Sequence, residues 1–369
     1  MASYIQSIGT ALPKHRHRQS DLSEHFQAGF DSPTTKRLIR AAFGKSGIEH
    51  RFSVLPEFTG GPLYDDSGYA PTDSRMRYYE REAPALALSA ATSAFDRVEI
   101  DPSEISHLVV VSCTGFTNPG IDLDLVRELG LDNSVERYLI GFMGCYGAFP
   151  ALRMADQFCR ADPQSKVLIV CVELCTLHMQ MKDHADAILG NAVFGDGAGA
   201  ALVTADQPDQ SAFKLDWFRS TTLPEGASEM AWSIGNEGFD LVLSSYVPKL
   251  IESHISEILA QSGFRPGEID EWAVHPGGRA ILDRFEAATS LPSGSLRASR
   301  NVLSAVGNLS SSTILFVLQE LLRDAGAGDT IGAVAFGPGL SIETAALTAT
   351  GSVSVDQAAK TTEDTPLAL

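Results

Sequence analysis

The chain has 369 residues, of which 44% are hydrophobic and 20% are charged. Its length excludes a small scaffold held together by disulfides and favours two domains or one duplicated architecture. Its hydrophobic content excludes a disordered chain. The formal net charge of −18 at pH 7 disfavours general binding to nucleic acids or to anionic membranes, because these surfaces are themselves negatively charged.

Signals for export and for membrane insertion are missing from the sequence. The longest apolar runs, such as residues 167–172, fall well short of the roughly 18 residues that cross a bilayer. The N-terminal residues do not lead from a charged into an apolar segment, so we expect no secretory signal and a cytoplasmic location. The five irregularly spaced cysteines are expected to be reduced thiols, and no Cys/His set around Cys171 and Cys175 predicts a metal site.

Short β-branched runs alternate with segments of helical period, which predicts an α/β fold. In chain order we expect a helix over 84–97, a strand over 107–112, a helix over 147–160, strands over 166–172 and 199–203, a helix over 246–262, a strand over 271–274, helices over 279–289 and 310–324, and a strand over 331–336. The strands are almost wholly apolar, so the sheet should be buried on both faces. Residues 351–369 lack periodicity and are expected to form a flexible tail.

Two stretches of the chain repeat the same order of features. A loop of small residues at 144–147 precedes a helix, a strand, and then an F-G-x-G turn at 194–197 that leads into an apolar strand. A second loop at 307–310 precedes the same order, with its F-G-x-G turn at 336–339. We interpret this echo as a degenerate duplication with halves 1–218 and 219–350; the alternative is a glycine turn that occurs twice by chance.

Several common catalytic motifs are excluded. The glycine cluster at 195–199 leads into an apolar strand rather than a helix, so it is a poor match to a dinucleotide-binding loop. The chain contains no Walker loop, no H-E-x-x-H and no G-x-S-x-G. Cysteine chemistry therefore remains as the best-supported class.

Cys145 stands where a nucleophile would be expected. It precedes a helix whose first turn offers unpaired backbone N–H groups and a positive dipole end, both of which favour the thiolate. Gly144 and Gly147 allow a substrate to approach closely. The alternative is a cysteine that only packs in the core, which we expect for the other four cysteines.

His275 and Asn308 complete a candidate set with Cys145. His275 follows a predicted strand, where side chains emerge from an open sheet into a ligand crevice, and Asn308 precedes a predicted helix, where it could alternatively be an N-cap. A cysteine with such partners can be acylated. The 130-residue spacing from Cys145 to His275 also occurs in papain-like proteases, but the signature around their cysteine is missing here.

Nearly the whole chain resembles the type III polyketide synthases, the chalcone synthase-like branch of the thiolase superfamily, and its start resembles bacterial members. The segments that carry the resemblance are Gly144-Cys145, Val193-Phe194-Gly195-Asp196-Gly197-Ala198, Trp272-Ala273-Val274-His275-Pro276-Gly277-Gly278, Gly307-Asn308-Leu309-Ser310-Ser311 and Phe336-Gly337-Pro338-Gly339-Leu340. The resemblance implies a duplicated, five-layered α/β/α/β/α fold in a homodimer, which agrees with the echo.

The resemblance also implies a mechanism. Cys145 would accept a starter from acyl-CoA, while His275 would hold it as a thiolate in an ion pair. His275 and Asn308 would donate hydrogen bonds to the thioester oxygen of malonyl-CoA and stabilise the enolate that forms as CO₂ leaves. No metal or redox cofactor is implied.

The same resemblance implies substrate-binding positions. Residues 1–51 carry eight basic against four acidic side chains, and among them Lys45 and Arg51 would pair with the CoA phosphates. Phe194 would lie between the CoA tunnel and the cavity. Its partner is Leu241 in one alignment and Phe239 in another. The loop that matches the family after the last strand contributes Gly337, Pro338 and Gly339.

Two other functions stay open at this point. A ketoacyl-carrier-protein synthase of the third kind shares Cys, His and Asn but usually has H-Q-A-N where this chain has residues 275–278 as H-P-G-G. A noncatalytic acyl-binding scaffold of the same fold is the second alternative. The starter, the number of extensions and the cyclisation mode depend on cavity volume; an alkylpyrone, an alkylresorcinol or a malonyl-primed aromatic is the expected product.

Overall fold

The structure is a computed structural model that describes residues 2–58, 61–65 and 69–351. A nine-stranded mixed sheet runs through the molecule in the order β11-β12-β13-β8-β1-β7-β6-β4-β5. Its first half contains β1 (Ser3–Ala11), β4 (His107–Ser112), β5 (Glu136–Gly141), β6 (Lys166–Leu174) and β7 (Asp196–Thr204). Its second half contains β8 (Ala212–Thr222), β11 (Glu271–Val274), β12 (Thr330–Gly337) and β13 (Ser341–Thr350).

The strand order is mirrored about the antiparallel pair of β1 and β8. On one side β1 is followed by β7, β6 and β4, and on the other β8 is followed by β13, β12 and β11. The pairing directions repeat as well, because β4 is parallel to β6 as β11 is to β12, and β6 is antiparallel to β7 as β12 is to β13. The predicted duplication is therefore confirmed in the topology.

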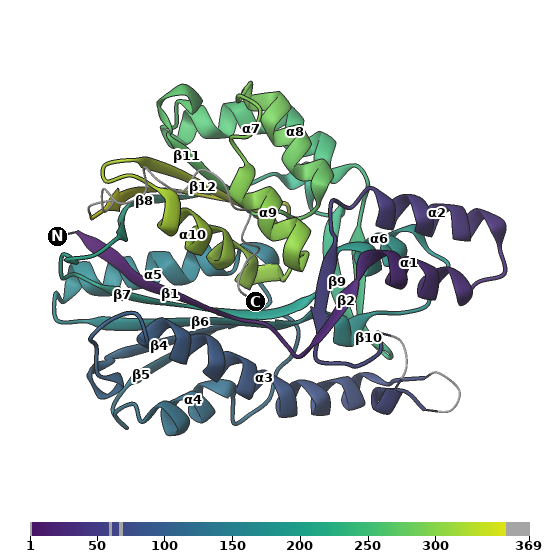
Figure 1. Cartoon of the computed structure of the whole chain (residues 1–369), viewed down its shortest axis with the longest axis horizontal. Coiled ribbons are helices and arrows are strands. Elements are labelled where there is room, and N and C mark those ends of the chain that lie inside the picture. Colours follow the sequence, from purple (N-terminus) through teal and green to yellow (C-terminus); the bar gives the residue numbers. More distant parts are fainter. Residues whose placement is uncertain (1, 59–60, 66–68, 352–369) are drawn as a thin grey trace, which may run out of the picture.

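The helices complete five layers (Figure 1). The central layer holds α5 (Ala148–Ala161) and α10 (Thr313–Asp324), whose buried residues share one core with strands of both halves. On one outer side, α3 (Thr72–Phe95) and α4 (Ile121–Leu129) pack on the first half-sheet. On the other, α7 (Val247–Ser262), α8 (Arg279–Thr289) and α9 (Arg297–Val306) contribute to the core over the second. Among the helices of the described ranges, none is long and apolar enough to cross a membrane.

The alternation of side chains along β6 shows why its sequence is apolar throughout. Val167, Ile169 and Cys171 lie in the central core, whereas Leu168 and Val170 lie in the outer core beneath α3. Since successive side chains of a strand point to opposite faces, a strand covered on both sides needs an unbroken apolar run. The prediction of burial on both faces is confirmed for β6, whereas the edge strand β5 is largely exposed.

A smaller region at one end of the molecule was not anticipated from the sequence. It contains a hairpin of β9 (Met230–Gly235) and β10 (Gly238–Leu243), a second strand pair of β2 (His15–Arg18) and β3 (His50–Ser53), and the helices α1 (Gln19–Ala28), α2 (Pro33–Gly44) and α6 (Ala185–Val193). Figure 1 shows these elements together at the right-hand side of the view.

The predicted elements recur with small shifts at their ends, and one needs correction. The predicted helix over 84–97 is wrong at its start, because α3 begins at Thr72 and runs through Pro84. Proline is well suited to the first turn of a helix, which is why a start there was expected. The predicted domain boundary after residue 218 falls within β8, and residues 352–369 of the predicted tail lie outside the described residues.

Candidate active site

A cavity of about 530 Å³ lies between the two halves of the chain and the β9–β10 hairpin. Cys145 from the first half and His275 and Asn308 from the second all line it. The remaining lining is predominantly apolar and includes Phe194 and Pro338. The structure therefore brings the three predicted catalytic residues to one place, which we call the central cavity.

Cys145 lies in a single 3₁₀ turn, Gly144–Tyr146, between β5 and α5. Gly144 has a φ of 74°. A Cβ atom there would lie 2.6 Å from Cδ of Pro338, so glycine is required both by its backbone conformation and by this close approach. The tight turn ends β5 abruptly and presents the Cys145 side chain to the central cavity.

Asn308 follows α9 and is held through its backbone. Its N–H donates to the carbonyl of Val193 at 2.9 Å, and its own carbonyl accepts from the N–H of Gly195 at 2.9 Å. Its side-chain Oδ1 accepts from the N–H of Ser310 at 2.9 Å, as a capping residue would. The amide Nδ2 lies 3.9 Å from Sγ of Cys145. One side chain thus caps a turn with its oxygen and offers its N–H₂ group to the site.

His275 continues the parallel pairing of β11 with β12, since its N–H donates to the carbonyl of Val334 at 2.8 Å. Only 1% of the residue is exposed. Within the described part of the chain, neither ring nitrogen has a hydrogen-bond partner. A buried polar group without a hydrogen-bond partner lowers the free energy of unfolding by about 1–3 kcal/mol. The imidazole is therefore available to form a hydrogen bond with a group that enters the central cavity.

Burial shifts the pKa values of both Cys145 and His275. It raises the pKa of the Cys145 thiol to about 11, although hydrogen bonds with Ser310 and Asn308 partly offset the effect. It also lowers the pKa of His275 to about 3. Both effects favour the neutral forms at pH 7. Burial thus opposes the thiolate that the N–H groups of the following turn favour, and the expected ion pair of Cys145 with His275 stays a prediction.

Glu173 forms hydrogen bonds to two loops of the site, and the sequence analysis did not identify it. It is fully buried at the end of β6 and accepts hydrogen bonds from the N–H of Cys113 at 3.0 Å and from Oγ1 of Thr114 at 2.8 Å. It also accepts one from Oγ of Ser311, in the turn that follows Asn308. Glu173 thus ties two loops that line the central cavity to β6. Its signal in the sequence is a lone acid within the apolar run over 166–174.

Phe194 lies close to Leu241, one of the two residues that the sequence offered as its partner. A Cβ atom on Gly190 of α6 would lie 2.7 Å from Cδ2 of Leu241 and 4.0 Å from Cδ2 of Phe194, so these two side chains flank the same glycine. Phe239 also lines the central cavity. Both candidates therefore line the central cavity, and Leu241 shares a contact at Gly190 with Phe194.

The loop at 337–339 lies between the nucleophile turn and the hairpin. Pro338 lines the central cavity against Gly144, while the backbone of Gly337 packs closely under the ring of Tyr146. Gly339 donates its N–H to the carbonyl of Met230 in β9, at 3.2 Å. The loop therefore connects the turn that carries Cys145 with the β9–β10 hairpin.

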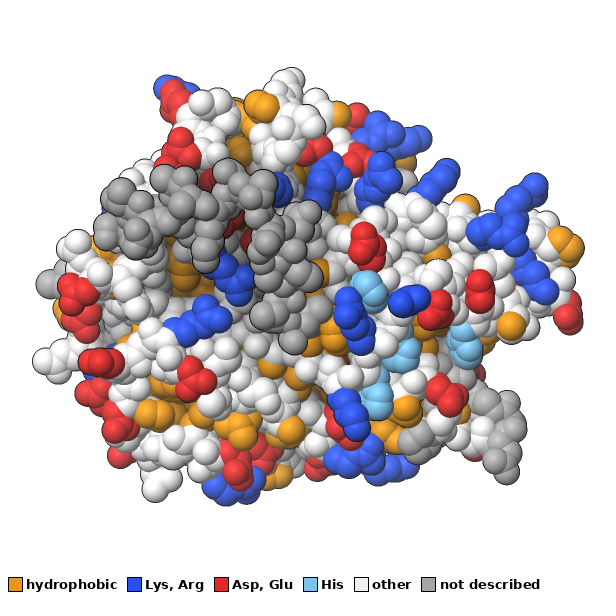
Figure 2. Space-filling model, in the orientation of Figure 1, with side chains coloured by type: hydrophobic (Ala, Val, Ile, Leu, Met, Phe, Trp, Pro, Cys, Tyr) orange, Lys and Arg blue, Asp and Glu red, His pale blue; other side chains and the backbone are white. Residues whose placement is uncertain are grey.

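The predicted phosphate-binding residues have different environments. Lys45 is exposed at the end of α2. The carbonyl of the next residue, Ser46, accepts from the N–H of Arg279 at the start of α8, at 3.2 Å. Figure 2 shows further Lys and Arg side chains over the end of the molecule formed by α2. Lys36, Arg37 and Arg40 line a shallow pocket there.

Arg51 is wrong as a phosphate ligand. Its side chain has no exposed area, and its Nη1 donates to the carbonyls of Asn191 at 2.7 Å and Phe194 at 2.8 Å. Its Nε donates to the side chain of Gln19 at 2.9 Å. A count of basic residues along the sequence does not distinguish surface from buried side chains. The contacts place Arg51 in the interior, where it holds the end of α6.

A metal site is not evident in the same region. Across the described ranges, no group of three or more His, Cys, Asp and Glu side chains is placed to hold a metal ion. All five cysteines are free. Cys113 and Cys175 line the central cavity with Cys145.

Comparison with known proteins gives a consistent result over residues 2–351. Residues 2–207 match the family model of the chalcone and stilbene synthases, N-terminal domain, and residues 214–351 match that of the C-terminal domain. The structure is similar to PKS-I from the brown alga Ectocarpus siliculosus, with a TM-score of 0.88 and 28% identity over 94% of this chain and 98% of that one. It also shares its fold with the C-terminal type III polyketide synthase domain of Steely1, a type I/III hybrid from Dictyostelium, with a TM-score of 0.87 and 24% identity over 94% of this chain and 99% of that one.

Proposed function

The chain belongs to the chalcone and stilbene synthase family of type III polyketide synthases, acyltransferases that catalyse decarboxylative condensation, and from this premise we propose how its residues perform the reaction. Cys145 takes a starter from acyl-CoA and extends it repeatedly with malonyl-CoA. The product then cyclises to a pyrone, a resorcinol or a related aromatic.

Loading begins when Sγ of Cys145 attacks the carbonyl carbon of the acyl-CoA thioester and gives its proton to the imidazole of His275. The C–S bond to CoA breaks, and His275 returns the proton to the departing CoA thiolate.

In the extension step, His275 and Asn308 act as hydrogen-bond donors. As the carboxylate of malonyl-CoA leaves as CO₂, negative charge develops on the thioester oxygen, where Nδ2 of Asn308 and an N–H of His275 donate hydrogen bonds. The resulting carbanion attacks the acyl carbon on Cys145, and the thiolate of Cys145 leaves. Transfer of the longer chain back to Cys145 releases CoA and allows another round. Every step balances without a metal ion or an electron acceptor.

One observation carries the proposal. Two buried nitrogens of His275 that lack partners and the amide Nδ2 of Asn308 line the same cavity as Cys145. Nδ2 of Asn308 also donates to the carbonyl of Gly277 at 3.4 Å, but a packing role for the cysteine would leave the two nitrogens of His275 without a purpose, because buried polar groups are normally paired.

Coenzyme A is proposed to enter past α2. The exposed ammonium of Lys45 follows α2, in a loop whose backbone meets the start of α8, and Ala280 and Ile281 of α8 line the central cavity. Lys36, Arg37 and Arg40 extend the positive charge along α2. Cations at the entrance favour the phosphates of CoA in a protein whose net charge is −18.

A homodimer is proposed on the basis of β5, the edge strand of the large sheet. An exposed strand edge offers unpaired N–H and C=O groups for pairing. Leu139 on β5 is 63% exposed, and Phe142 and Phe116 nearby are 49% and 47% exposed. A contiguous apolar surface at a strand edge is typical of an interface between protein chains.

The proposal is tested with a panel of acyl-CoA primers, from acetyl to palmitoyl and including aromatic ones, incubated with radiolabelled malonyl-CoA and resolved by mass. Products with several malonyl-derived units, formed from at least one primer, are expected. A single condensation that occurs only with malonyl on a carrier protein would favour a ketoacyl-carrier-protein synthase. No product with any primer would favour a noncatalytic scaffold.

A further inference from the structure

Seven basic side chains near the N-terminus have no acidic partner. They lie on β2, on α2 and next to these elements, and we call them the basic face: Lys14, Arg16, Arg18, Lys36, Arg37, Arg40 and Lys45. Six are exposed and the seventh, on α2, is half-buried. Among the described residues, no carboxylate forms an ion pair with any of them. Figure 2 shows Lys, Arg and His side chains over β2 and α2.

The arginines of the adjoining helices behave differently. The carbonyl of Ser46, the residue after the basic face ends, accepts from the backbone N–H at the start of α8. All four arginines of α8 and α9 form ion pairs with carboxylates: Arg279, Arg284, Arg297 and Arg300. Unpaired cations are therefore a property of the basic face and not of this whole end of the molecule.

The acidic residues of the same region do not neutralise the basic face. Asp21, Glu24, Asp31 and Glu49 lie within it along the chain, yet none of them pairs with its cations. Nη2 of Arg16 lies 3.2 Å from Nδ1 of His50 instead. Burial and the charge of Arg16 lower the pKa of His50, so the ring is neutral at pH 7. In a protein with a net charge of −18, this concentration of free positive charge indicates a surface that meets an anionic partner.

The exposed side of α2 combines its charges with an apolar side chain. Exposed residues recur at helical spacing from the first turn to the end of the helix: Thr34, Arg37, Leu38, Ala41 and Lys45. Leu38 is 40% exposed, and the three cations of α2 line a shallow pocket on the same helix. A leucine contributes nothing to the binding of phosphate groups. An apolar residue surrounded by arginine and lysine is typical of an interface with another protein.

Only one helix separates α2 from the central cavity. Ile39 of α2 and Ile188 of α6 share one hydrophobic core. Leu189 and Gly190, the next residues of α6, line the central cavity. A partner bound to the exposed side of α2 would therefore lie close to the entrance that we propose for CoA.

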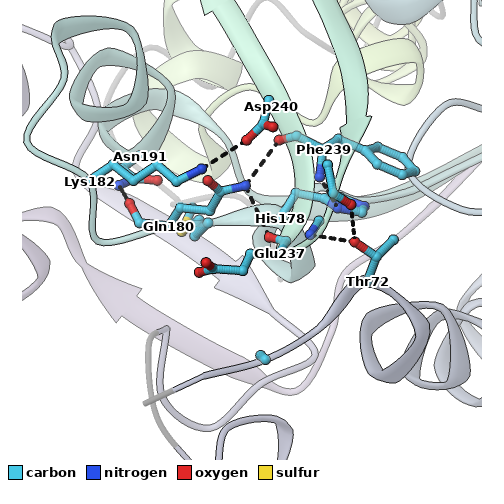
Figure 3. Close-up of polar contacts among 12 residues, drawn as sticks. Thr72, His178, Gln180, Lys182, Asn191, Glu237, Phe239 and Asp240 are labelled. Carbon is cyan, nitrogen blue, oxygen red and sulfur yellow. Dashed lines mark hydrogen bonds and ion pairs between the residues drawn. The ribbon is translucent and has the colours of Figure 1, made fainter. Parts of the chain in front are cut away.

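Hydrogen bonds also connect α2 with the mouth of the central cavity. Oγ1 of Thr35 donates to the carboxylate of Asp183 at 2.9 Å. The neighbouring Lys182 pairs with Asp240 of β10 at 2.9 Å, and both of these side chains line the central cavity. Figure 3 shows this ion pair between the loop and the hairpin, beside the hydrogen bond that Gln180 donates to the hairpin backbone. The basic face is thus firmly connected to the cavity mouth.

The charge of the rest of the chain restricts the kind of anion that can bind. Because the basic face is positive, the remainder of the chain is more negative than the net charge of −18. A nucleic acid or an anionic membrane is extended and would also meet this negative remainder. A small folded acidic protein can contact the basic face alone.

We propose that the basic face docks an acidic protein that carries the starter acyl group on a phosphopantetheine arm. The inference rests on the proposed function, since it supplies the acyl group to Cys145. The arm ends in the same thioester as acyl-CoA. Sγ of Cys145 attacks the carbonyl carbon, the C–S bond to the arm breaks, and the arm thiol leaves with the proton that Cys145 gives up through His275. Malonyl groups still arrive on CoA.

The test compares three donors of the same acyl groups, from acetyl to palmitoyl: acyl-CoA, acyl-pantetheine, and an acidic acyl-carrier protein of a bacterial fatty-acid synthase. The second-order rate of Cys145 acylation in the full-length protein is followed by intact-protein mass spectrometry. With at least one acyl group, the carrier protein should react about tenfold or more faster than acyl-pantetheine, which has the arm without the protein. This advantage should shrink as the salt concentration rises, because it depends on charge.

Variants of the basic face should separate the carrier protein from CoA. We expect Leu38→Asp, and the double variant Arg16→Glu with Arg18→Glu, to lower the rate with the carrier protein about tenfold. The rate with acyl-CoA should stay within about twofold of wild type, which also shows that the variants fold. Leu123→Asp on α4 is the matched control for Leu38→Asp, because the two leucines are 41% and 40% exposed. Arg323→Glu, at an exposed position at the end of α10, is the control for charge, and both controls should leave both rates unchanged.

The outcomes separate this inference from the proposed function. A carrier protein that reacts no faster than acyl-pantetheine, or variants that slow acyl-CoA and the carrier protein equally, would overturn the docking surface alone. Sedimentation of the wild type, but not of the double arginine variant, with vesicles of anionic phospholipid would assign the basic face to a membrane and would also overturn it. Acylation that malonyl-CoA never extends would overturn the proposed function alone. Failure of every donor to acylate Cys145 would overturn both.

Discussion

At the scale of single residues, the main feature of the site is a buried imidazole whose nitrogens lack hydrogen-bond partners. His275 is buried at the end of β11, and its two nitrogens meet no described hydrogen-bonding group. Asn308 has its oxygen engaged by Ser310 and its nitrogen turned toward Cys145. The two ring nitrogens of His275 and Nδ2 of Asn308 are therefore placed at the central cavity before a substrate binds.

The shifts in pKa at the site predict how the reactivity of Cys145 depends on pH. Because burial raises the pKa of Cys145 to about 11 and lowers that of His275 to about 3, the thiolate fraction should rise roughly tenfold per pH unit between pH 7 and pH 10. The alkylation rate by iodoacetamide, followed by peptide mass spectrometry on the Cys145 peptide, should rise in parallel. A rate that is already constant at pH 7 would show that His275 holds the proton at rest.

Substitution of the donors should separate the two half-reactions. His275→Ala or Asn308→Ala is expected to lower malonyl-CoA decarboxylation by about 10²–10³-fold, because each removes a hydrogen bond to the developing oxyanion. Some acylation of Cys145 by the starter should survive in both variants. The measurement is CO₂ release from labelled malonyl-CoA beside intact-protein mass for acylation.

Matched controls for these substitutions lie on the surface. His254→Ala and Asn301→Ala remove an imidazole and an amide far from the central cavity and should leave both rates near wild type. Equal loss of decarboxylation and of acylation in the His275 and Asn308 variants would contradict the assigned roles.

The sequence predicted the positions of Cys145, His275 and Asn308 because each stands at the junction of a strong pattern and a glycine-rich turn. It failed at Arg51 and Glu173, whose roles depend on burial. The local sequence around a basic residue near the N-terminus, or around an acidic residue within a strand, does not show which distant segments will surround its side chain.

At the scale of elements, β5 is the part of the sheet that most needs a partner. It forms an edge of the nine-stranded sheet, and Leu139 on it is 63% exposed. We expect Leu139→Asp to convert a dimer to a monomer, because a charge at this position would be desolvated on association. Light scattering after size exclusion gives the mass directly.

A second exposed leucine provides the control for β5. Leu38 on α2 is 40% exposed, and Leu38→Asp should leave the oligomeric state unchanged. A wild type that is monomeric at micromolar concentration, or a Leu139→Asp variant that remains dimeric, would contradict the proposed interface.

The start of β7 carries a second titrating group. Asp196 accepts from the N–H of Thr176 at 2.8 Å and from that of Val54 at 2.9 Å, and burial raises its pKa to about 6. The unfolded value is near 3.9, so between about pH 4 and pH 6 the folded chain keeps a proton that the unfolded chain has lost. This contribution to stability is complete below pH 4 and falls by roughly 3 kcal/mol through pH 6.

The Asp196 effect is measured as a difference between proteins. The free energy of unfolding of the wild type relative to Asp196→Asn should fall by roughly 3 kcal/mol from pH 4 to pH 7, since the variant lacks the titrating group. Asp209→Asn, at an exposed position, should show a difference that is nearly independent of pH. A wild-type advantage that grows with pH over this range would reverse the inferred sign.

Elements with strong periodicity could be predicted to within a few residues, as β4, β11 and α8 show. The hairpin of β9 and β10 could not be predicted, because its strands are short and its position is determined by contacts with His178 and Thr72 from other segments. The start of α3 was misplaced because Pro84 suggested a first turn. Tertiary packing outweighs such local signals.

At the scale of the whole molecule, duplication creates the site. The first half provides Cys145 before α5, and the second provides Asn308 in the equivalent turn before α10 and His275 at the end of β11. The echo in the sequence predicted this architecture, since it preserves the order of loop, helix and strands. The volume and shape of the central cavity did not follow from it, because they depend on how the hairpin closes over the junction.

The most direct test of repeated extension on Cys145 is mass analysis of its peptide during turnover with a starter acyl-CoA and malonyl-CoA. The account predicts a series of adducts on this peptide, the starter alone and the starter with successive C₂H₂O units, and none in Cys145→Ala. Adducts confined to the starter, or a series carried by another cysteine, would contradict it.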